Sequence, residues 1–238
     1  MKITPRLKAI AKKVPPGSVT ADIGTDHAYL PVFLVRQGLV PRAIGIEKAE
    51  HPLNNARDQV HAAGYSHLIQ IRQGYGLEPL APGEVETAVI AGMGGKTVTE
   101  IMDRSPEQLA RLKRLILQPM NDVPEVRAWL LDNSWDLVEE DLVREGKMFY
   151  FIIVAEPAAA PHLPPTPYSG LEMEIGPLLI RDRHPVLKEY LGVLMAREEK
   201  TLASLKNSGR PEVRRQEARV SDRLEELKEL NRKIQQER

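Results

Sequence analysis

Residues 19–31, V-T-A-D-I-G-T-D-H-A-Y-L-P, constrain the fold of this chain more than any other segment. A short apolar run ends at Asp22, and the chain then turns at Gly24. Asp26 and His27 follow before a helical pattern begins. A strand, a glycine turn and a helix in this order are typical of the first unit of a nucleotide-binding α/β domain.

Acidic side chains stand in this turn where a dinucleotide-binding domain would have the glycines of G-x-G-x-x-G. Asp22 and Asp26 would repel a diphosphate, whereas they would attract a ligand that carries an ammonium and a sulfonium. The turn therefore favours S-adenosylmethionine (SAM) as the cofactor over NAD, and an NAD oxidoreductase is the weakest alternative.

Strand and helix patterns alternate along the first half of the chain. Strands are predicted over 18–23, 42–47, 68–72, 85–91 and 115–118, and helices over 3–14, 28–37, 52–63, 96–103 and 124–132. Residues 135–144 and 148–156 then form a predicted antiparallel pair. This order predicts an α/β fold of the Rossmann-like kind, a mostly parallel, doubly wound sheet with an antiparallel edge.

A proline-rich connector at residues 157–170 predicts a domain boundary, with one domain over 1–160 and a helical domain over 161–238. In the second domain, apolar residues recur at helical spacing on both sides of a break at 207–211. Two long amphipathic helices around a tight break predict an antiparallel coiled-coil hairpin.

Composition narrows the function classes. The chain has no cysteine and no histidine spacing of a metal site, so neither disulfides nor a structural metal are expected. No apolar run is long enough to cross a bilayer and no signal peptide is visible, which predicts a soluble, cytoplasmic protein with no membrane partner. The oligomeric state is open, with a monomer favoured.

Net charge is zero, yet both ends of the chain are basic. The first twenty residues carry five Lys or Arg and no acid, and the segment from Arg181 onward carries 15 Lys or Arg against 11 Asp or Glu. Basic ends can hold an anionic polymer locally, although solvated helix faces of an ordinary kind explain the same pattern.

Ligands of open α/β sheets bind beyond the carboxyl ends of the strands. An acid such as Glu47 at the end of the second strand accepts hydrogen bonds from ribose hydroxyls in NAD and SAM proteins alike, and a solvated acid is the alternative. The glycines near Met93 let the backbone lie against a flat ring, or simply make a tight turn into a helix. The predicted cofactor-binding residues are Asp22, Gly24, Asp26, Glu47, Gln73, Gly74, Gly92, Met93 and Gly94.

Two further groups are candidates for chemistry at this edge. His27 beside Asp26 is either a base with an orienting carboxylate or a loop-stabilising pair, and both residues are the catalytic candidates. Residues 118–121 either line the pocket for an acceptor base or cap the following helix.

The chain resembles the bacterial TrmK family, class I SAM-dependent methyltransferases that act on N1 of adenine 22 in tRNA. The resemblance lies in A-D-I-G-T-D-H-A-Y-L-P at 21–31, I-A-G-M-G-G at 90–95, and L-I-L-Q-P at 115–119 followed by R-x-W-L at 127–130. It implies tRNA as partner, in-line transfer of the methyl group to N1, and a coiled coil after the catalytic domain. By the same resemblance, Asp26 would stabilise the cationic product ring and His27 would take an N6 proton, although no base is strictly required.

Two positions differ from the family pattern. Tyr75 stands where an aspartate near the cofactor adenine is usual, and Met120 stands where an asparagine is usual, with Asn121 one place on. Two alternatives therefore stay open. One is a methyltransferase of another RNA or of a small molecule, and the other is an inactive SAM-fold module that acts in protein assembly.

Overall fold

The computed structural model describes residues 3–160, 168–208 and 214–236. The chain forms two compact units, residues 1–169 and 170–238. No helix in the described parts of the chain has both the length and the apolar character that a membrane span requires.

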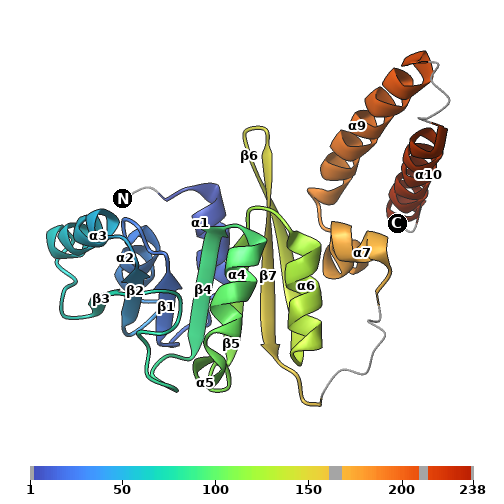
Figure 1. Ribbon diagram of the computed structural model, residues 1–238. Helices are drawn as coiled ribbons and strands as arrows, with labels where there is room; N and C mark the ends of the chain where they lie inside the picture. Colours follow the sequence, from blue (N-terminus) through green and yellow to red (C-terminus); the bar gives the residue numbers. More distant parts are fainter. Residues whose placement is uncertain (1–2, 161–167, 209–213, 237–238) are drawn as a thin grey trace. The chain divides into compact units, whose positions relative to one another are not determined.

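The first unit is built on one seven-stranded sheet (Figure 1). Its strands are β1 (Thr20–Ile23), β2 (Ala43–Glu47), β3 (Ile69–Gln73), β4 (Thr87–Met93), β5 (Arg114–Pro119), β6 (Trp135–Glu145) and β7 (Met148–Pro157). They lie in the order β3-β2-β1-β4-β5-β7-β6, with β1 to β5 parallel and β7 antiparallel to both β5 and β6. The predicted doubly wound sheet with an antiparallel edge is confirmed.

Helices cover both faces of this sheet. They are α1 (Pro5–Lys13), α2 (Tyr29–Arg36), α3 (Glu50–Ala62), α4 (Gly95–Asp103), α5 (Pro106–Leu109) and α6 (Val123–Asp132). The helices α1, α2 and α3 share one apolar cluster, whereas α4 and α6 pack on each other, α4 also on β4 and β5, and α6 on β6 and β7. The sequence did not predict α5, because a four-residue helix is too short to show a 3.6-residue period.

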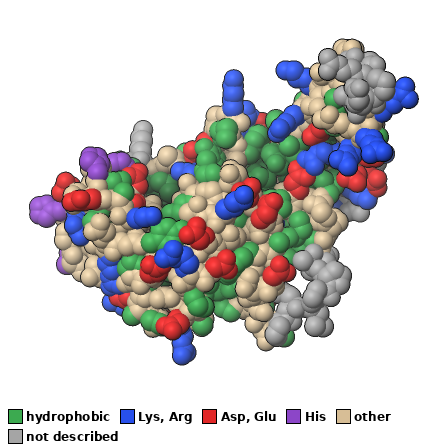
Figure 2. All heavy atoms as spheres, in the orientation of Figure 1, with side chains coloured by type: hydrophobic (Ala, Val, Ile, Leu, Met, Phe, Trp, Pro, Cys, Tyr) green, Lys and Arg blue, Asp and Glu red, His purple; other side chains and the backbone are tan. Residues whose placement is uncertain are grey.

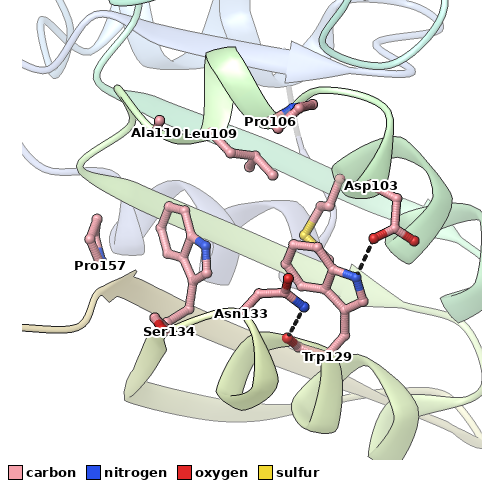
Figure 3. A pocket seen from close by; sticks show the side chains of 10 residues that line it. Asp103, Pro106, Leu109, Ala110, Trp129, Asn133, Ser134 and Pro157 are labelled. Carbon is pink, nitrogen blue, oxygen red and sulfur yellow. Dashed lines mark hydrogen bonds between the residues drawn. The ribbon is translucent and has the colours of Figure 1, made fainter. Parts of the chain in front are cut away.

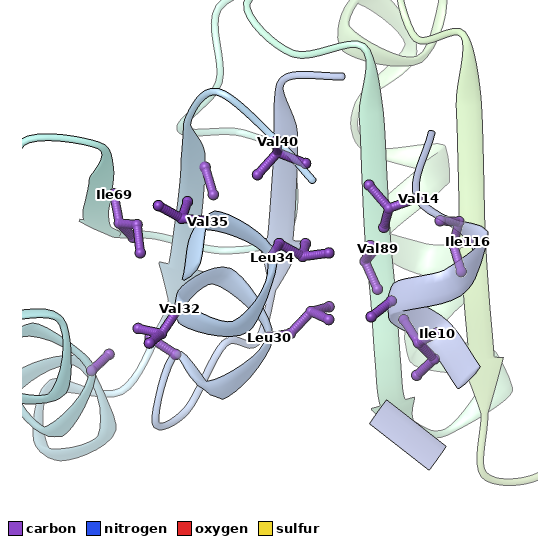
Figure 4. Close-up of a cluster of buried hydrophobic side chains, with 14 of the residues drawn as sticks. Ile10, Val14, Leu30, Val32, Leu34, Val35, Val40, Ile69, Val89 and Ile116 are labelled. Carbon is purple, nitrogen blue, oxygen red and sulfur yellow. The ribbon is translucent and has the colours of Figure 1, made fainter. Parts of the chain in front are cut away.

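The N-terminal helix α1 is part of the core of this unit (Figure 4). Pro5 occupies its first turn, and the hydroxyl of Thr4 accepts a hydrogen bond from the Leu7 amide at 3.2 Å. Ile10 and Val14 are buried in the same cluster as strand residues of β4 and β5. The helix is therefore held against the sheet rather than exposed beside it.

The second unit contains α7 (Gly170–Ile175), α8 (Pro177–Arg181), α9 (Leu187–Ser208) and α10 (Arg214–Gln236). The long helices α9 and α10 pack along each other, as the sequence predicted for a hairpin. The Arg223 side chain of α10 forms ion pairs with Glu198 on α9 at 3.1 Å and with Glu174 on α7 at 2.8 Å. Residues 209–211 of the predicted break lie outside the described residues.

Candidate functional site

The loops after β1 and β3 are both joined to the end of β2 by backbone hydrogen bonds at the carboxyl edge of the sheet. The amides of Gly24 and Thr25 both donate to the carbonyl of Ile46, at 2.8 and 3.0 Å. The amide of Gly74 donates to the carbonyl of Glu47 at 3.1 Å. The residues predicted from the ends of different strands therefore lie beside one another.

Asp22 occupies the centre of this edge, in register with Gly45 of β2 and Val89 of β4. Its carboxylate is buried and accepts a hydrogen bond from the Thr25 hydroxyl at 2.7 Å. Burial raises the pKa of Asp22 to about 7, the nearby charge of Glu47 adds to the rise, and the Thr25 hydroxyl opposes it. A cation placed beside this carboxyl would favour its ionised form.

Glu47 is held by the backbone that follows it. Its Oε1 accepts hydrogen bonds from the amides of Lys48 at 2.9 Å and Ala49 at 3.0 Å, and its Oε2 accepts from the Asp26 amide at 3.3 Å. Ala49 is at the N-cap position of α3 and has no side chain that could cap the helix, so the Glu47 carboxylate meets one of the free amides at this helix start. Three of the roughly four acceptor sites of the carboxylate are taken by these amides, and Oε2 keeps one site for a ligand hydroxyl.

The turn between β1 and α2 contains two strained residues that the sequence did not reveal. Asp26 and Ala28 have φ of 48° and 52°, in the left-handed region that non-glycine residues adopt at a cost of about 1–2 kcal/mol. Because of this geometry α2 begins at Tyr29. Strain of this kind persists only where the surrounding contacts enforce it, here the hydrogen bonds of the turn to β2.

His27 and Asp26 form a loose, exposed pair. His27 Nε2 lies 3.6 Å from Asp26 Oδ2, with side-chain exposures of 42% and 62%. The imidazole also stacks on Tyr29, with ring centres 5.2 Å apart. Both side chains are exposed in the turn after β1, and their catalytic roles stay predictions.

The end of β4 contains a bulge at Gly92. Ala91 is in register with Gln118 of β5, but Met93 is in register with Pro119, so Gly92 is the extra residue, and its φ is 77°. The bulge turns the Met93 side chain toward the β1 turn, where an ideal Cβ on Gly24 would lie 2.3 Å from Met93 Cε.

The segment after β5 makes no side-chain cap on the helix that follows it, and its predicted place beside an acceptor base stays a prediction. The Oδ1 of Asn121 accepts a hydrogen bond from the amide of Gly95 at 2.9 Å, and an ideal Cβ on Gly94 would lie 3.1 Å from the same oxygen. Asn121 therefore satisfies an amide at the N-terminus of α4. Asp122 makes no side-chain cap bond at the start of α6.

The residues after β3 border Glu47. Gln73 is in register with Glu47, and its Nε2 is 3.5 Å from the Lys48 carbonyl. Tyr75 lies close to two cations, with Lys48 Nζ at 5.0 Å and the guanidinium carbon of Arg104 at 4.8 Å from its ring centre. Burial and a hydrogen bond to Glu100 raise the pKa of Tyr75. The tyrosine is thus a cation-bordered ring at the position where the resemblance would place an acid.

A separate cavity of about 350 Å³ lies among the ends of α4 and α6, α5 and the start of β6 (Figure 3). It is lined by Trp129 and Trp135, and the indole of Trp129 donates to Asp103 Oδ1 at 2.8 Å. The cavity contains none of the predicted site residues. Within the described residues there is also no group of three or more His, Asp or Glu side chains that could hold a metal ion.

Alanine at position 24 is expected to raise the Kd of an adenosyl ligand about tenfold, because the added Cβ forces the Met93 thioether into the ligand's space. Its φ of 70° also strains the alanine, by about 1–2 kcal/mol. Gly17→Ala is the matched control, since Gly17 has φ of 82° with no atom within 4 Å of the added Cβ. Calorimetry with S-adenosylhomocysteine and urea unfolding separate the effects: both variants lose stability, and only Gly24→Ala loses affinity.

Comparison with known proteins adds a consistent set of matches. The methyltransferase domain family matches residues 3–153. The tRNA (adenine(22)-N(1))-methyltransferase of Bacillus subtilis (strain 168) is 31% identical over 235 residues, 97% of each chain.

Solved structures agree with this match. The crystal structure of the B. subtilis m1A22 tRNA methyltransferase TrmK has a TM-score of 0.81 at 30% identity, over 97% of this chain and 99% of that chain. The Streptococcus pneumoniae protein Sp1610, in complex with SAM, has a TM-score of 0.80 at 31% identity, over 97% of this chain and 100% of that chain.

Proposed function

Since the chain belongs to the family of tRNA (adenine(22)-N1)-methyltransferases, we propose that it transfers a methyl group from SAM to N1 of adenine 22 in tRNA. The observation that carries the proposal is the pair of carboxylates, Asp22 and Glu47, at the ends of adjacent parallel strands. A dinucleotide diphosphate would be repelled at this edge, whereas a cationic nucleoside is attracted.

The residues at this edge fit SAM. Glu47 Oε2 offers an acceptor site to a ribose hydroxyl, and the buried Asp22 offers a carboxyl that a nearby ammonium would ionise. Gly24 and Gly92 present backbone without side chains on either side of Met93. When bound, SAM supplies an activated methyl group on its sulfonium.

The chain itself has to align the acceptor and stabilise its charge. Adenine N1 carries a lone pair and needs no activation, so correct alignment is the main requirement and is worth about 7–11 kcal/mol. The acceptor ring becomes cationic on methylation, and the exposed carboxylate of Asp26 is the group that would stabilise this charge. His27, 3.6 Å away, would orient that carboxylate or take an N6 proton.

The basic ends of the chain are the proposed contacts to tRNA phosphates. On α1, Lys8 and Lys12 are exposed, whereas Lys13 is committed to Glu139 and Asp141 at 2.6 and 2.9 Å. Lys2, one of the five basic residues of the N-terminal segment, lies outside the described residues. On the face of the first unit shown in Figure 2, basic and acidic side chains are interspersed, so the charge of that face does not select an anionic polymer.

Three exposed arginines of α10 test the contribution of the second unit. Replacing Arg214, Arg215 and Arg219 together by glutamine is expected to raise the Kd of tRNA about tenfold and to flatten its salt dependence by roughly one unit of slope per lost phosphate contact. Arg36→Gln is the control, an exposed arginine at the end of α2 that lies at the opposite edge of the sheet from the site. An unchanged affinity in the triple variant would exclude α10 from the tRNA interface.

The activity itself is tested with purified protein, methyl-labelled SAM and tRNA transcribed without modifications. The label is expected in tRNA as 1-methyladenosine, with a reverse-transcription stop at position 22. A tRNA with guanine at position 22 is the control and is expected to stay unlabelled. Label at another nucleotide would redirect the proposal to a different RNA site. Absence of both label and SAM binding by calorimetry would favour an inactive SAM-fold module.

A further inference from the structure

Arg6 reaches from α1 to the ends of β4 and β5. Its Nη1 donates to Gln118 Oε1 at 2.7 Å and lies 3.9 Å from Met120 Sδ. The guanidinium carbon is 5.0 Å from the ring centre of Tyr150 on β7. A Cβ added at Gly92 would lie 3.5 Å from the same Nη1, so the guanidinium lies beside the bulged end of β4.

Gln118 is fully buried, and its amide is fixed at both ends. The oxygen faces Arg6, while Nε2 donates to the Pro119 carbonyl at 3.0 Å and lies 3.6 Å from Met120 Sδ. Three residues after Gln118, the side chain of Asn121 accepts a hydrogen bond from the Gly95 amide. Arg6, Gln118, Met120 and Asn121, here called the acceptor wall, thus connect α1 to the N-terminus of α4.

Anchoring of α1 does not account for this arrangement. The helix is already held by buried Ile10 and Val14 and by Lys13, whose Nζ pairs with two carboxylates of β6. Arg6 Nε, in contrast, is buried without a hydrogen-bond partner among the described residues, and an unmet buried donor is costly. The position of the guanidinium is therefore governed by Gln118 and Tyr150 rather than by satisfaction of all its donors.

Arg6 could either stabilise the methylated ring directly or shape the loop beside it, and its charge decides between these two roles. A guanidinium beside the acceptor would oppose the positive charge that develops on a methylated adenine ring, so direct stabilisation of that ring is excluded. Its Nη1 is engaged by Gln118, and its plane lies near the Tyr150 ring. The remaining role for Arg6 is to control the shape of the loop after β5.

We propose that Arg6 is a positioning residue. It fixes the Gln118 amide and, through it, Met120 and Asn121, the other residues of the acceptor wall against which the target base is aligned. This inference rests on the proposed function, because the acceptor is taken to be an adenine of tRNA. It assigns to the helix that precedes the first strand a part in catalysis that its amphipathic pattern does not reveal.

The test compares Arg6→Met with Lys13→Met, which removes another side-chain tether of α1 to the sheet and leaves the backbone tethers at Arg6 and Lys13 in place. Arg6→Met is expected to lower kcat for tRNA methylation roughly 10- to 100-fold, because small misplacements of reacting groups are that costly. The Kd of S-adenosylhomocysteine is expected to change less than twofold. Arg6→Lys is expected to recover only part of the rate, because an ammonium lacks the planar donor fork. Lys13→Met is expected to keep kcat within twofold.

A second readout needs neither tRNA nor cofactor. Hydrogen exchange of peptides covering 92–97 and 117–123 is expected to be faster in Arg6→Met than in Lys13→Met, because only the first loses the acceptor wall. The double variant with Arg6→Met and Gln118→Leu is expected to have a kcat no lower than that of the more damaging single variant, since the two residues act as a unit. Equal exchange and equal turnover in the Arg6 and Lys13 variants would overturn the inference and leave Arg6 as an anchor. A wild-type protein that does not methylate tRNA would defeat the proposed function, while the exchange comparison would still decide the role of Arg6.

Discussion

Glutamine at position 47 is expected to raise the Kd of SAM by roughly 10²-fold. The carboxylate of Glu47 is held by three backbone amides and presents its remaining acceptor site, on Oε2, at the end of β2. A hydrogen bond from a hydroxyl to a carboxylate is worth about 1.5–3 kcal/mol, and the NH2 group of a glutamine can accept neither from the ribose nor from the backbone amides. Isothermal titration calorimetry with SAM and S-adenosylhomocysteine measures the change directly.

Glu50→Gln is the matched control for this substitution. Glu50 is an exposed acid in the first turn of α3, three residues beyond Glu47, and removing its charge tests the effect of net charge alone. The control is expected to bind both ligands within twofold of the wild type. Equal affinities in the two variants would show that Glu47 only caps α3 and does not contact the ribose.

Asparagine at position 22 is expected to stabilise the protein above pH 7 and at the same time to weaken cofactor binding about 10²-fold. Burial raises the pKa of Asp22 from 3.8 to about 7. A carboxyl with a raised pKa favours the folded state while it is protonated, so its contribution is complete below about pH 4 and is lost as the pH rises toward and through 7. Ionised Asp22 therefore lowers the free energy of unfolding by about 4 kcal/mol at pH 8.

Urea unfolding at pH 5 and pH 8 checks the first part of this prediction. Between these two values the wild type is expected to lose stability relative to Asp22→Asn, whose amide still accepts a hydrogen bond from Thr25. Asp58→Asn, at an exposed position of α3, is expected to follow the wild type. Calorimetry at pH 8 checks the second part. Parallel pH dependence, together with an unchanged Kd, would mean that Asp22 carries no functional charge.

The fold and the edge that carries the site follow from local patterns. Apolar runs ending in Asp22 and Glu47 predicted parallel strands whose carboxyl ends meet, and the register of β1 on β2 brings those ends together. A rule about strand ends was sufficient here, because parallel strands share one edge. Helix α3, predicted from Pro52, begins at Glu50, and the carboxylate of Glu47 accepts a hydrogen bond from the amide of Ala49 at its N-cap position.

Other features of the site depend on contacts that no local pattern reveals. The Gly92 bulge is a matter of register between β4 and β5, and the left-handed Asp26 and Ala28 are imposed by the turn's bonds to β2. Arg6 meets Gln118 across 112 positions of sequence. Its lysine-rich helix suggested only a basic surface. Such contacts arise from tertiary packing, which decides the geometry after the elements are fixed.

The central claim is that the carboxylates at the ends of β1 and β2 hold a cationic methyl donor. A crystal structure of the protein with SAM at saturating concentration tests this claim most directly. We predict density for the nucleoside at the carboxyl edge, with a ribose hydroxyl on Glu47 and the ammonium on the side of Asp22. Density for the ligand at any other place, or an edge that stays empty while the protein methylates tRNA, would contradict the account.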